Sequence, residues 1–183
     1  TSEMKNDLSA NATKLSGTIP VIYTFLARSG CHVDSVELIG LDKEGKEGPS
    51  EGSKHPGVKI GFTGKAGQKQ TVYYFSTNLA SWMIKQDPGF IRFCEGLGAP
   101  NGFTKSASYL MHLKEFDLVR DLLLAKCSTL LQDDTGVMWK DFPRDVWTPK
   151  AYGWYPGPIA RFKDQYQADL AGVYKAGDVP PIP

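Results

Sequence analysis

Five side chains of this sequence have the types and the order that acid–base chemistry requires. They are Ser106, Ser108, His112, Asp133 and Asp134. In a Ser-His-Asp hydrolase the histidine takes the proton of the serine, and a carboxylate orients the histidine. Alternation in residues 104–113 predicts a strand with both serines and the histidine on one face, although the same residues also suit the start of a helix. No G-x-S-x-G motif surrounds either serine, so a hydrolase is the alternative hypothesis rather than the favoured one.

The adjacent aspartates in LLQDDTG, residues 130–136, also suit two other roles. Two neighbouring carboxylates can bind a cation, which would make this a cation-stabilised structural protein, but the segment does not match the EF-hand loop. Asp133 at the first position and Gly136 at the fourth fit a type I turn. We expect the preceding helix to end at Leu130 or Leu131, so that both carboxylates lie beyond the helix dipole. The favoured interpretation is a turn.

The cysteines and the remaining histidines do not form a metal-binding pattern. Cys31, Cys94 and Cys127 include no C-x-x-C pair, which argues against a zinc ribbon, a thioredoxin motif or attached haem. The pair Cys31-His32 with His55 or His112 has no compact ligand spacing. We therefore predict no metal and no cofactor.

Residues 139–159, WKDFPRDVWTPKAYGWYPGPI, contain three of the four tryptophans together with several prolines. Prolines hold a segment extended, and aromatic rings on such a segment can stack on sugar faces or anchor a partner protein. The favoured interpretation for most of the rings is packing against the sheet or the helices, with Trp154 and Tyr155 as the exceptions because they flank Gly and Pro at a turn. The predicted binding surface consists of Trp147, Tyr152, Trp154 and Tyr155.

The order of the predicted elements indicates an α+β fold. Residues 32–76 predict an antiparallel sheet of three or more strands, with a long loop at 43–57 and a hairpin turn at GKAGQ. Three to five helices pack with this sheet, and their predicted positions are 18–29, 78–84, 88–97, 115–130 and 158–176. We expect one α+β domain over residues 17–177, a polar lead-in at 1–16 and an extended tail at 178–183.

Charge and hydropathy exclude some classes of partner. The formal net charge is +1, from 21 Lys and Arg against 20 Asp and Glu, and no basic run suggests nucleic acid. No apolar run approaches the ~20 residues that a membrane-spanning helix needs. We predict neither a nucleic-acid partner nor a membrane span.

Three segments together resemble an uncharacterised family of bacterial proteins that are exported or lipoprotein-like. The segments are KSASYLMH (105–112), LLQDDTG (130–136) and YGWYPGPIARFKDQYQADLAGVY (152–174), and the similarity extends over about residues 17–176. The resemblance implies a periplasmic or envelope location and a chain that is part of a longer protein, but no particular activity. This sequence departs from the family pattern at Val137-Met138-Trp139, where a small residue before Ile-Pro is usual, so a role for the exit of that turn is in doubt.

The aromatic and proline-rich features are stronger than any catalytic constellation. We therefore expect a non-catalytic extracytoplasmic protein, namely a binding or accessory subunit that contacts a protein partner or a glycan. An envelope hydrolase and a cation-stabilised structural protein remain the alternatives.

Overall fold

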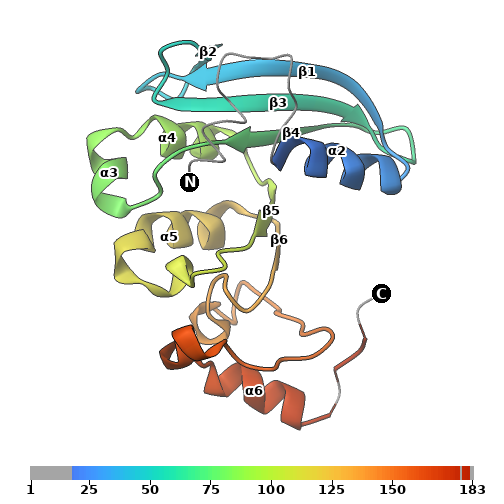
Figure 1. The fold of residues 1–183 in the computed structure, drawn as a ribbon, viewed down its shortest axis with the longest axis vertical. Coiled ribbons are helices and arrows are strands. Elements are labelled where there is room, and N and C mark those ends of the chain that lie inside the picture. The colour runs from blue at the N-terminus through green and yellow to red at the C-terminus, as the bar shows by residue number, and fades with distance from the viewer. Residues whose placement is uncertain (1–17, 178, 182–183) are drawn as a thin grey trace. The chain divides into compact units, whose positions relative to one another are not determined.

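The structure, a computed structural model, describes residues 18–177 and 179–181, and it has an α+β fold as the sequence predicts (Figure 1). The chain divides into two compact units. Unit 1 comprises Thr1–Asn78 and Met83–Gly96, and unit 2 comprises Leu79–Trp82 and Leu97–Pro183. The grouping of residues 17–177 into one domain stays a prediction.

Unit 1 is built on a four-stranded antiparallel sheet with the strand order β2-β1-β3-β4 (Figure 1). Its strands are β1 His32–Leu41, β2 Glu47–Pro49, β3 His55–Thr63 and β4 Lys69–Phe75. The predicted long loop at 43–57 is wrong in part, because it contains β2 and the first residues of β3. The Ser53 hydroxyl accepts a hydrogen bond from the Leu41 amide (3.1 Å) and donates one to the Leu41 carbonyl (3.0 Å), which ties this segment to β1.

The predicted hairpin between β3 and β4 is confirmed. The Gly64 amide donates to the Gln68 carbonyl at 2.8 Å, and Gly67 has a φ of 84°, which glycine adopts without steric cost. The two strands pair in one continuous register from Gly57 opposite Phe75 to Thr63 opposite Lys69.

The core of unit 1 lies between the sheet and helix α2 (Thr18–Arg28). Val58 and Ile60 of β3 are fully buried and pack with Ile19 and Leu26 of this helix. Burying a side chain of this size contributes ~1.5–3 kcal/mol. The helix is predicted correctly, and Phe25 on it is 68% exposed.

The other elements are shorter, and several belong to unit 2. They are α3 Ser81–Gln86, α4 Gly89–Gly96, β5 Asn101–Thr104, η1 Leu110–His112, η2 Lys114–Phe116, α5 Asp117–Lys126, β6 Thr129–Gln132, η3 Trp139–Asp141, η4 Ala160–Gln165 and α6 Ala168–Lys175. Strands β5 and β6 pair in parallel as a separate two-stranded sheet. Helix α3 is shared, since Ser81 and Trp82 fall in unit 2 and the rest of the helix falls in unit 1.

Two predictions around residues 104–136 are wrong. The helix expected over 115–130 ends at Lys126, and residues 129–132 form β6 instead. Residues 105–109 do not continue β5, because Ala107 and Tyr109 have positive φ angles of 42° and 59°, which a strand does not allow.

The helix expected over 158–176 is also divided. It consists of η4 and α6, which are separated at Tyr166 and Gln167. The Gln167 amide donates to the Tyr155 hydroxyl at 3.0 Å rather than to a helix carbonyl, and this interrupts the helical hydrogen bonds. Gly177, with a φ of 91°, follows the end of α6 as the sequence predicts.

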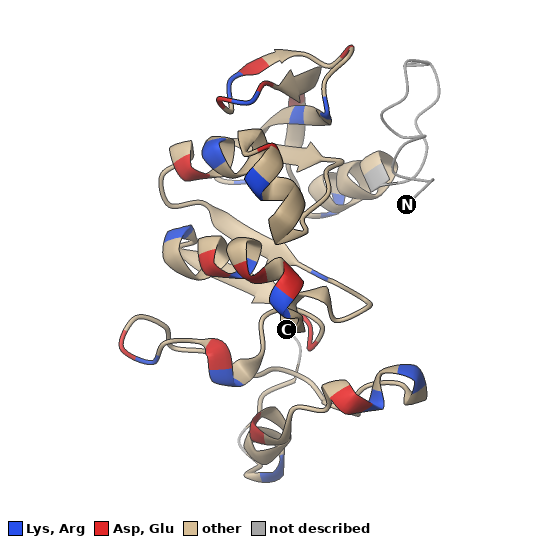
Figure 2. Cartoon of the chain, turned by 90° about the vertical axis from the view of Figure 1, so that its left-hand side faces the viewer, with Lys and Arg blue, Asp and Glu red and all other residues tan. Residues whose placement is uncertain are grey.

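Charged residues are dispersed over the surface. Figure 2 shows Lys and Arg interspersed with Asp and Glu along the helices and loops, without a long stretch of one sign. Among the described residues, no helix is both long and apolar enough to cross a membrane.

Candidate functional site

The acid pair lies in a turn that follows a strand. The Gly136 amide donates to the Asp133 carbonyl at 3.1 Å, and Asp133 Oδ1 accepts hydrogen bonds from the amide (3.0 Å) and the hydroxyl (2.5 Å) of Thr135. This geometry confirms the predicted turn. The element that leads into Asp133 is strand β6, and not the helix that the sequence predicts.

Thr135 joins this turn to the segment that contains the two candidate serines. Its Oγ1 accepts hydrogen bonds from the amides of Ser106 (2.8 Å) and Ala107 (3.0 Å). The structure therefore brings the acid turn and residues 106–107 together, although they are far apart in the sequence. The link is a hydroxyl that sequence reasoning did not single out.

The serine hydroxyls do not contact His112. Ser106 Oγ accepts a hydrogen bond from the Leu110 amide (2.7 Å), and Ser108 Oγ donates to the Ser106 carbonyl (3.0 Å). His112 Nδ1 bonds to Gln165 Oε1 (3.2 Å), and its buried Nε2 has no hydrogen-bond partner in the part of the chain that is described. Burial lowers the pKa of His112, against the opposing effect of Gln165. No contact between a nucleophile and a base therefore supports a hydrolase at these residues.

Asp134 is bound by a buried tyrosine. The Tyr109 hydroxyl donates to Asp134 Oδ2 at 2.7 Å, and Tyr109 is almost fully buried. Burial, with this hydrogen bond and the charge of Asp134, raises the pKa of Tyr109 far above its ordinary value. Tyr109 is therefore a neutral hydrogen-bond donor at every pH at which the protein would work.

Gln167 connects the acid turn to the aromatic segment. Its side chain is buried, accepts a hydrogen bond from the Trp139 amide (2.8 Å) and donates one to the Asp134 carbonyl (2.8 Å). Its own amide donates to the Tyr155 hydroxyl. Through these three bonds one residue positions the turn, η3 and the Tyr155 ring.

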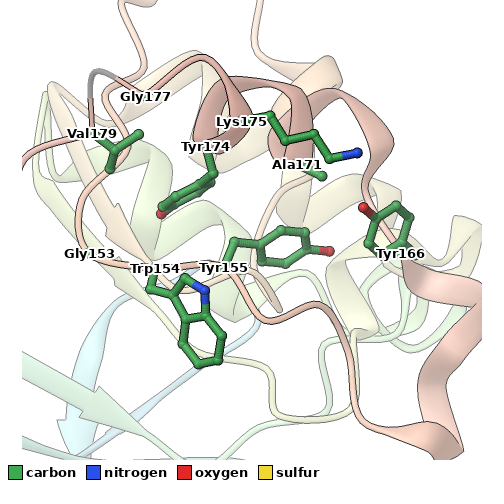
Figure 3. A pocket seen from close by; sticks show the side chains of 9 residues that line it. All are labelled: Gly153, Trp154, Tyr155, Tyr166, Ala171, Tyr174, Lys175, Gly177 and Val179. Atoms are coloured by element: carbon green, nitrogen blue, oxygen red, sulfur yellow. The ribbon is translucent and has the colours of Figure 1, made fainter.

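A pocket of about 370 Å³ opens beside Tyr155 (Figure 3). The side chains that line it include Trp154, Tyr155, Tyr166, Ala171, Tyr174 and Lys175. All of these residues belong to unit 2. The volume is at the lower end of the ~300–1,000 Å³ range of small-molecule sites.

Three tyrosine rings form the wall of this pocket. The Tyr155 ring lies between the other two, with its centroid 5.9 Å from that of Tyr166 and 6.1 Å from that of Tyr174, and with interplanar angles of 30° and 31°. Gly157 allows the Tyr166 ring to approach, because a Cβ at this position would lie 3.3 Å from that ring. Figure 3 shows the Lys175 side chain extending on the Tyr166 side of the pocket.

The tyrosine hydroxyls are held by backbone groups. The Tyr174 hydroxyl donates to the Tyr152 carbonyl at 2.8 Å, and the Tyr155 hydroxyl accepts the Gln167 amide. Burial raises the pKa values of both Tyr155 and Tyr174. These bonds hold both rings in place, so the pocket offers rigid aromatic faces to a ligand.

The predicted binding surface is divided by the structure. Trp154, which is 79% exposed, and Tyr155 both line the pocket. Trp147 is half-buried, donates from Nε1 to the Leu124 carbonyl (3.0 Å) and packs edge-on against Phe142 at 5.5 Å. Tyr152 is exposed and contributes its carbonyl.

Sequence reasoning did not single out Tyr166, Tyr174 or Lys175, although all three fall in the helix predicted over 158–176. The only signal for the three residues was their position after the aromatic segment, in a helix with several tyrosines. The break at Gln167, which turns Tyr166 toward the pocket, has no signal of its own.

The described residues contain no group of three or more His, Cys, Asp or Glu that could hold a metal ion. Comparisons with protein-family models, with curated proteins and with solved structures give no match.

Proposed function

We propose that this chain is an extracytoplasmic binding or accessory subunit, and that the pocket of unit 2 is a non-catalytic site for one sugar unit of a glycan. The observation that carries the proposal is Trp154, a largely exposed indole at a pocket walled by three tyrosines. The extracytoplasmic location rests on the family resemblance alone.

The chemistry of the pocket suits a saccharide better than a charged or purely apolar ligand. A pyranose has apolar C–H faces that stack on aromatic rings and a rim of hydroxyls that exchange hydrogen bonds. The pocket supplies both kinds of contact, since the rings of Tyr155 and Tyr174 are held rigidly and Lys175 offers a donor. A rigid site loses little conformational entropy on binding.

A protein partner that inserts one side chain into the pocket is the second candidate. Exposed Trp and Tyr are frequent hot-spot residues in protein interfaces. In unit 2 the side chains of Tyr166 and Ile159 are more than half exposed, as is that of Trp154. This exposure favours a contact surface that extends beyond the pocket.

Binding of oligosaccharides tests the proposal. Chitotetraose, cellotetraose and maltotetraose are titrated against the chain by calorimetry and by tryptophan fluorescence. We expect Trp154→Ala to weaken binding at least ~10-fold, which corresponds to ~1.4 kcal/mol. The matched control is Trp82→Ala, because Trp82 is 57% exposed and does not line the pocket. Equal affinities of Trp154→Ala and the unchanged chain would contradict the proposal, and so would the absence of binding to any glycan on an array.

A further inference from the structure

Unit 1 contains a second, smaller pocket with a different chemistry. It has a volume of about 220 Å³, and its lining includes Lys54, His55, Thr77, Met83 and Asp87. His55 and Asp87 are buried, and Thr77 is half-buried. None of these residues belongs to the site in unit 2.

Three of these side chains form a hydrogen-bonded series. Thr77 Oγ1 lies 2.7 Å from His55 Nδ1, and His55 Nε2 lies 3.1 Å from Asp87 Oδ1. A hydroxyl, an imidazole and a carboxylate in this order are the parts of an activated nucleophile, in which the base touches the nucleophile and a third group orients the base. In Ser-His-Asp hydrolases Nε2 contacts the nucleophile and Nδ1 contacts the carboxylate. In this protein Nδ1 contacts the Thr77 hydroxyl and Nε2 contacts the carboxylate.

Different parts of unit 1 hold the three groups. His55 begins β3, and its amide donates to Ser53 Oγ at 3.1 Å. Asp87 precedes α4, and its carboxylate accepts the Gly89 amide. A Cβ at Gly89 would overlap the Asp42 carbonyl oxygen and would lie 3.4 Å from the His55 ring, so the glycine allows this close packing.

The environment of Asp87 determines which nitrogen of His55 carries the proton. Burial raises the pKa of Asp87, but the hydrogen bond and charge of His55, with the charge of Lys54, outweigh burial and leave the pKa below its ordinary value. An ionised carboxylate only accepts hydrogen bonds, so Nε2 must donate to it. In the neutral ring Nδ1 then has a lone pair, which accepts the Thr77 proton.

We propose that Thr77, His55 and Asp87 hydrolyse small carboxylic esters, with Thr77 as the nucleophile, His55 as the general base and acid, and Asp87 as the positioning residue. Thr77 Oγ1 attacks the ester carbonyl carbon while its proton passes to His55 Nδ1. The bond to the leaving alcohol breaks, and His55 returns the proton to the alcohol oxygen. Water then attacks the acyl group on Thr77 and gives a proton to His55. His55 passes this proton to Thr77 Oγ1 as the acid leaves. One ester and one water give one acid and one alcohol.

The size of the pocket limits the substrate. About 220 Å³ is below the ~300 Å³ of typical sites for drug-sized ligands, so a short acyl group such as acetyl fits best. Met83 supplies an apolar contact for the acyl methyl group. Lys54, which lies 3.6 Å from Asp87 and has a side chain that is 76% exposed, places a positive charge at the opening.

Hydrolysis of 4-nitrophenyl acetate by the full chain tests this proposal. We expect Thr77→Val to lower the rate at least ~100-fold, the lower limit for loss of acid–base and nucleophilic function, while Thr77→Ser retains most of it. Thr71→Val is the matched control, because Thr71 is an exposed threonine on β4, and its rate should not change. Circular dichroism establishes that each variant is folded.

The covalent intermediate gives a readout that does not depend on any variant. The unchanged chain is mixed with the ester, quenched in acid and digested, and mass spectrometry should locate the acetyl group on Thr77. Three results would each overturn the proposal. They are an acetyl group on another residue, a Thr77→Val rate within ~10-fold of the rate of the unchanged chain, and hydrolysis by the unchanged chain that is no faster than in buffer.

Discussion

In unit 1, His55 and Asp87 are buried against a regular four-stranded sheet, whereas in unit 2 Thr135 and Gln167 are buried among turns and short helices. The sheet supplies its own backbone hydrogen bonds, and the buried side chains of His55 and Asp87 bond to each other. In unit 2 the polar side chains bond to backbone groups that have no regular partner, such as the amide of Trp139 and the carbonyl of Asp134. The same kinds of side chain are therefore available for chemistry in unit 1 and are used for structure in unit 2.

The tryptophans allow this comparison to be tested unit by unit. All four of them, at positions 82, 139, 147 and 154, belong to unit 2. Tryptophan fluorescence therefore reports the unfolding of unit 2, while hydrogen exchange at the buried β3 residues Val58 and Ile60 reports the stability of unit 1.

The largest effect is expected for Gln167→Ala. This change removes two part-buried side-chain hydrogen bonds, to the Trp139 amide and to the Asp134 carbonyl, so we expect a loss of ~3 kcal/mol from the free energy of unfolding. Urea unfolding, followed by tryptophan fluorescence, measures this free energy of unfolding. Gln165→Ala, which removes only the bond to His112, is the control, and its cost should be ~1 kcal/mol. Equal costs for the two variants would show that Gln167 is not the organising residue of unit 2.

A smaller and pH-dependent effect is expected for Asp87→Asn. The variant loses a charge-assisted hydrogen bond from His55 and an ion pair with Lys54, so we expect a cost of ~2 kcal/mol at pH 7. Because the pKa of Asp87 is lowered in the folded chain, its contribution is complete above the unfolded value of ~3.9 and is lost as the pH falls through the folded value. The difference between the two proteins should therefore shrink between pH 7 and pH 3.

Hydrogen exchange at Val58 and Ile60, measured at both pH values, is the readout for this prediction. Glu51→Gln makes the same acid-to-amide change at an exposed position of unit 1 and should leave the exchange rates unchanged. A difference that stays constant or grows on acidification would contradict the assigned role of Asp87.

The smallest losses of stability are expected for alanine substitutions of the two candidate serines, and the two losses should differ. Ser106→Ala leaves the Leu110 amide without its acceptor and should cost ~1 kcal/mol, whereas Ser108→Ala removes a bond at an exposed residue and should stay within ~0.5 kcal/mol. Thermal unfolding of the two variants measures both changes. If Ser108→Ala proved the costlier of the two, the hydrogen bonds of this segment would have to be assigned differently.

Local patterns in the sequence predicted the regular parts of the fold. GKAGQ placed the β3–β4 hairpin, and the spacing of Asp133 and Gly136 placed the turn. In each case the responsible residues are neighbours in the chain. Their preferences act through backbone angles and local hydrogen bonds, which a sequence displays directly.

The parts that were missed depend on residues far apart in the sequence. Thr77 and Asp87 meet His55 from 22 and 32 positions away, and Gln167 reaches Asp134 from 33 positions away. A single sequence contains no signal for such a meeting. The strand predicted at 104–113 failed for the same reason, because the distant Thr135 hydroxyl binds the Ser106 and Ala107 amides and holds the chain in another conformation.

Because α3 belongs to both units, no single cleavage of the chain can divide it into one unit and the other. A cut after Asn78 leaves residues 83–96 of unit 1 on the fragment of unit 2, and a cut after Gly96 leaves residues 79–82 of unit 2 on the fragment of unit 1. The Ser81 hydroxyl donates to Asp117, which is synthesised 36 residues later, and accepts the Leu118 amide. On the ribosome, the first turn of α3 can therefore acquire its native partners only after all of unit 1 has been made.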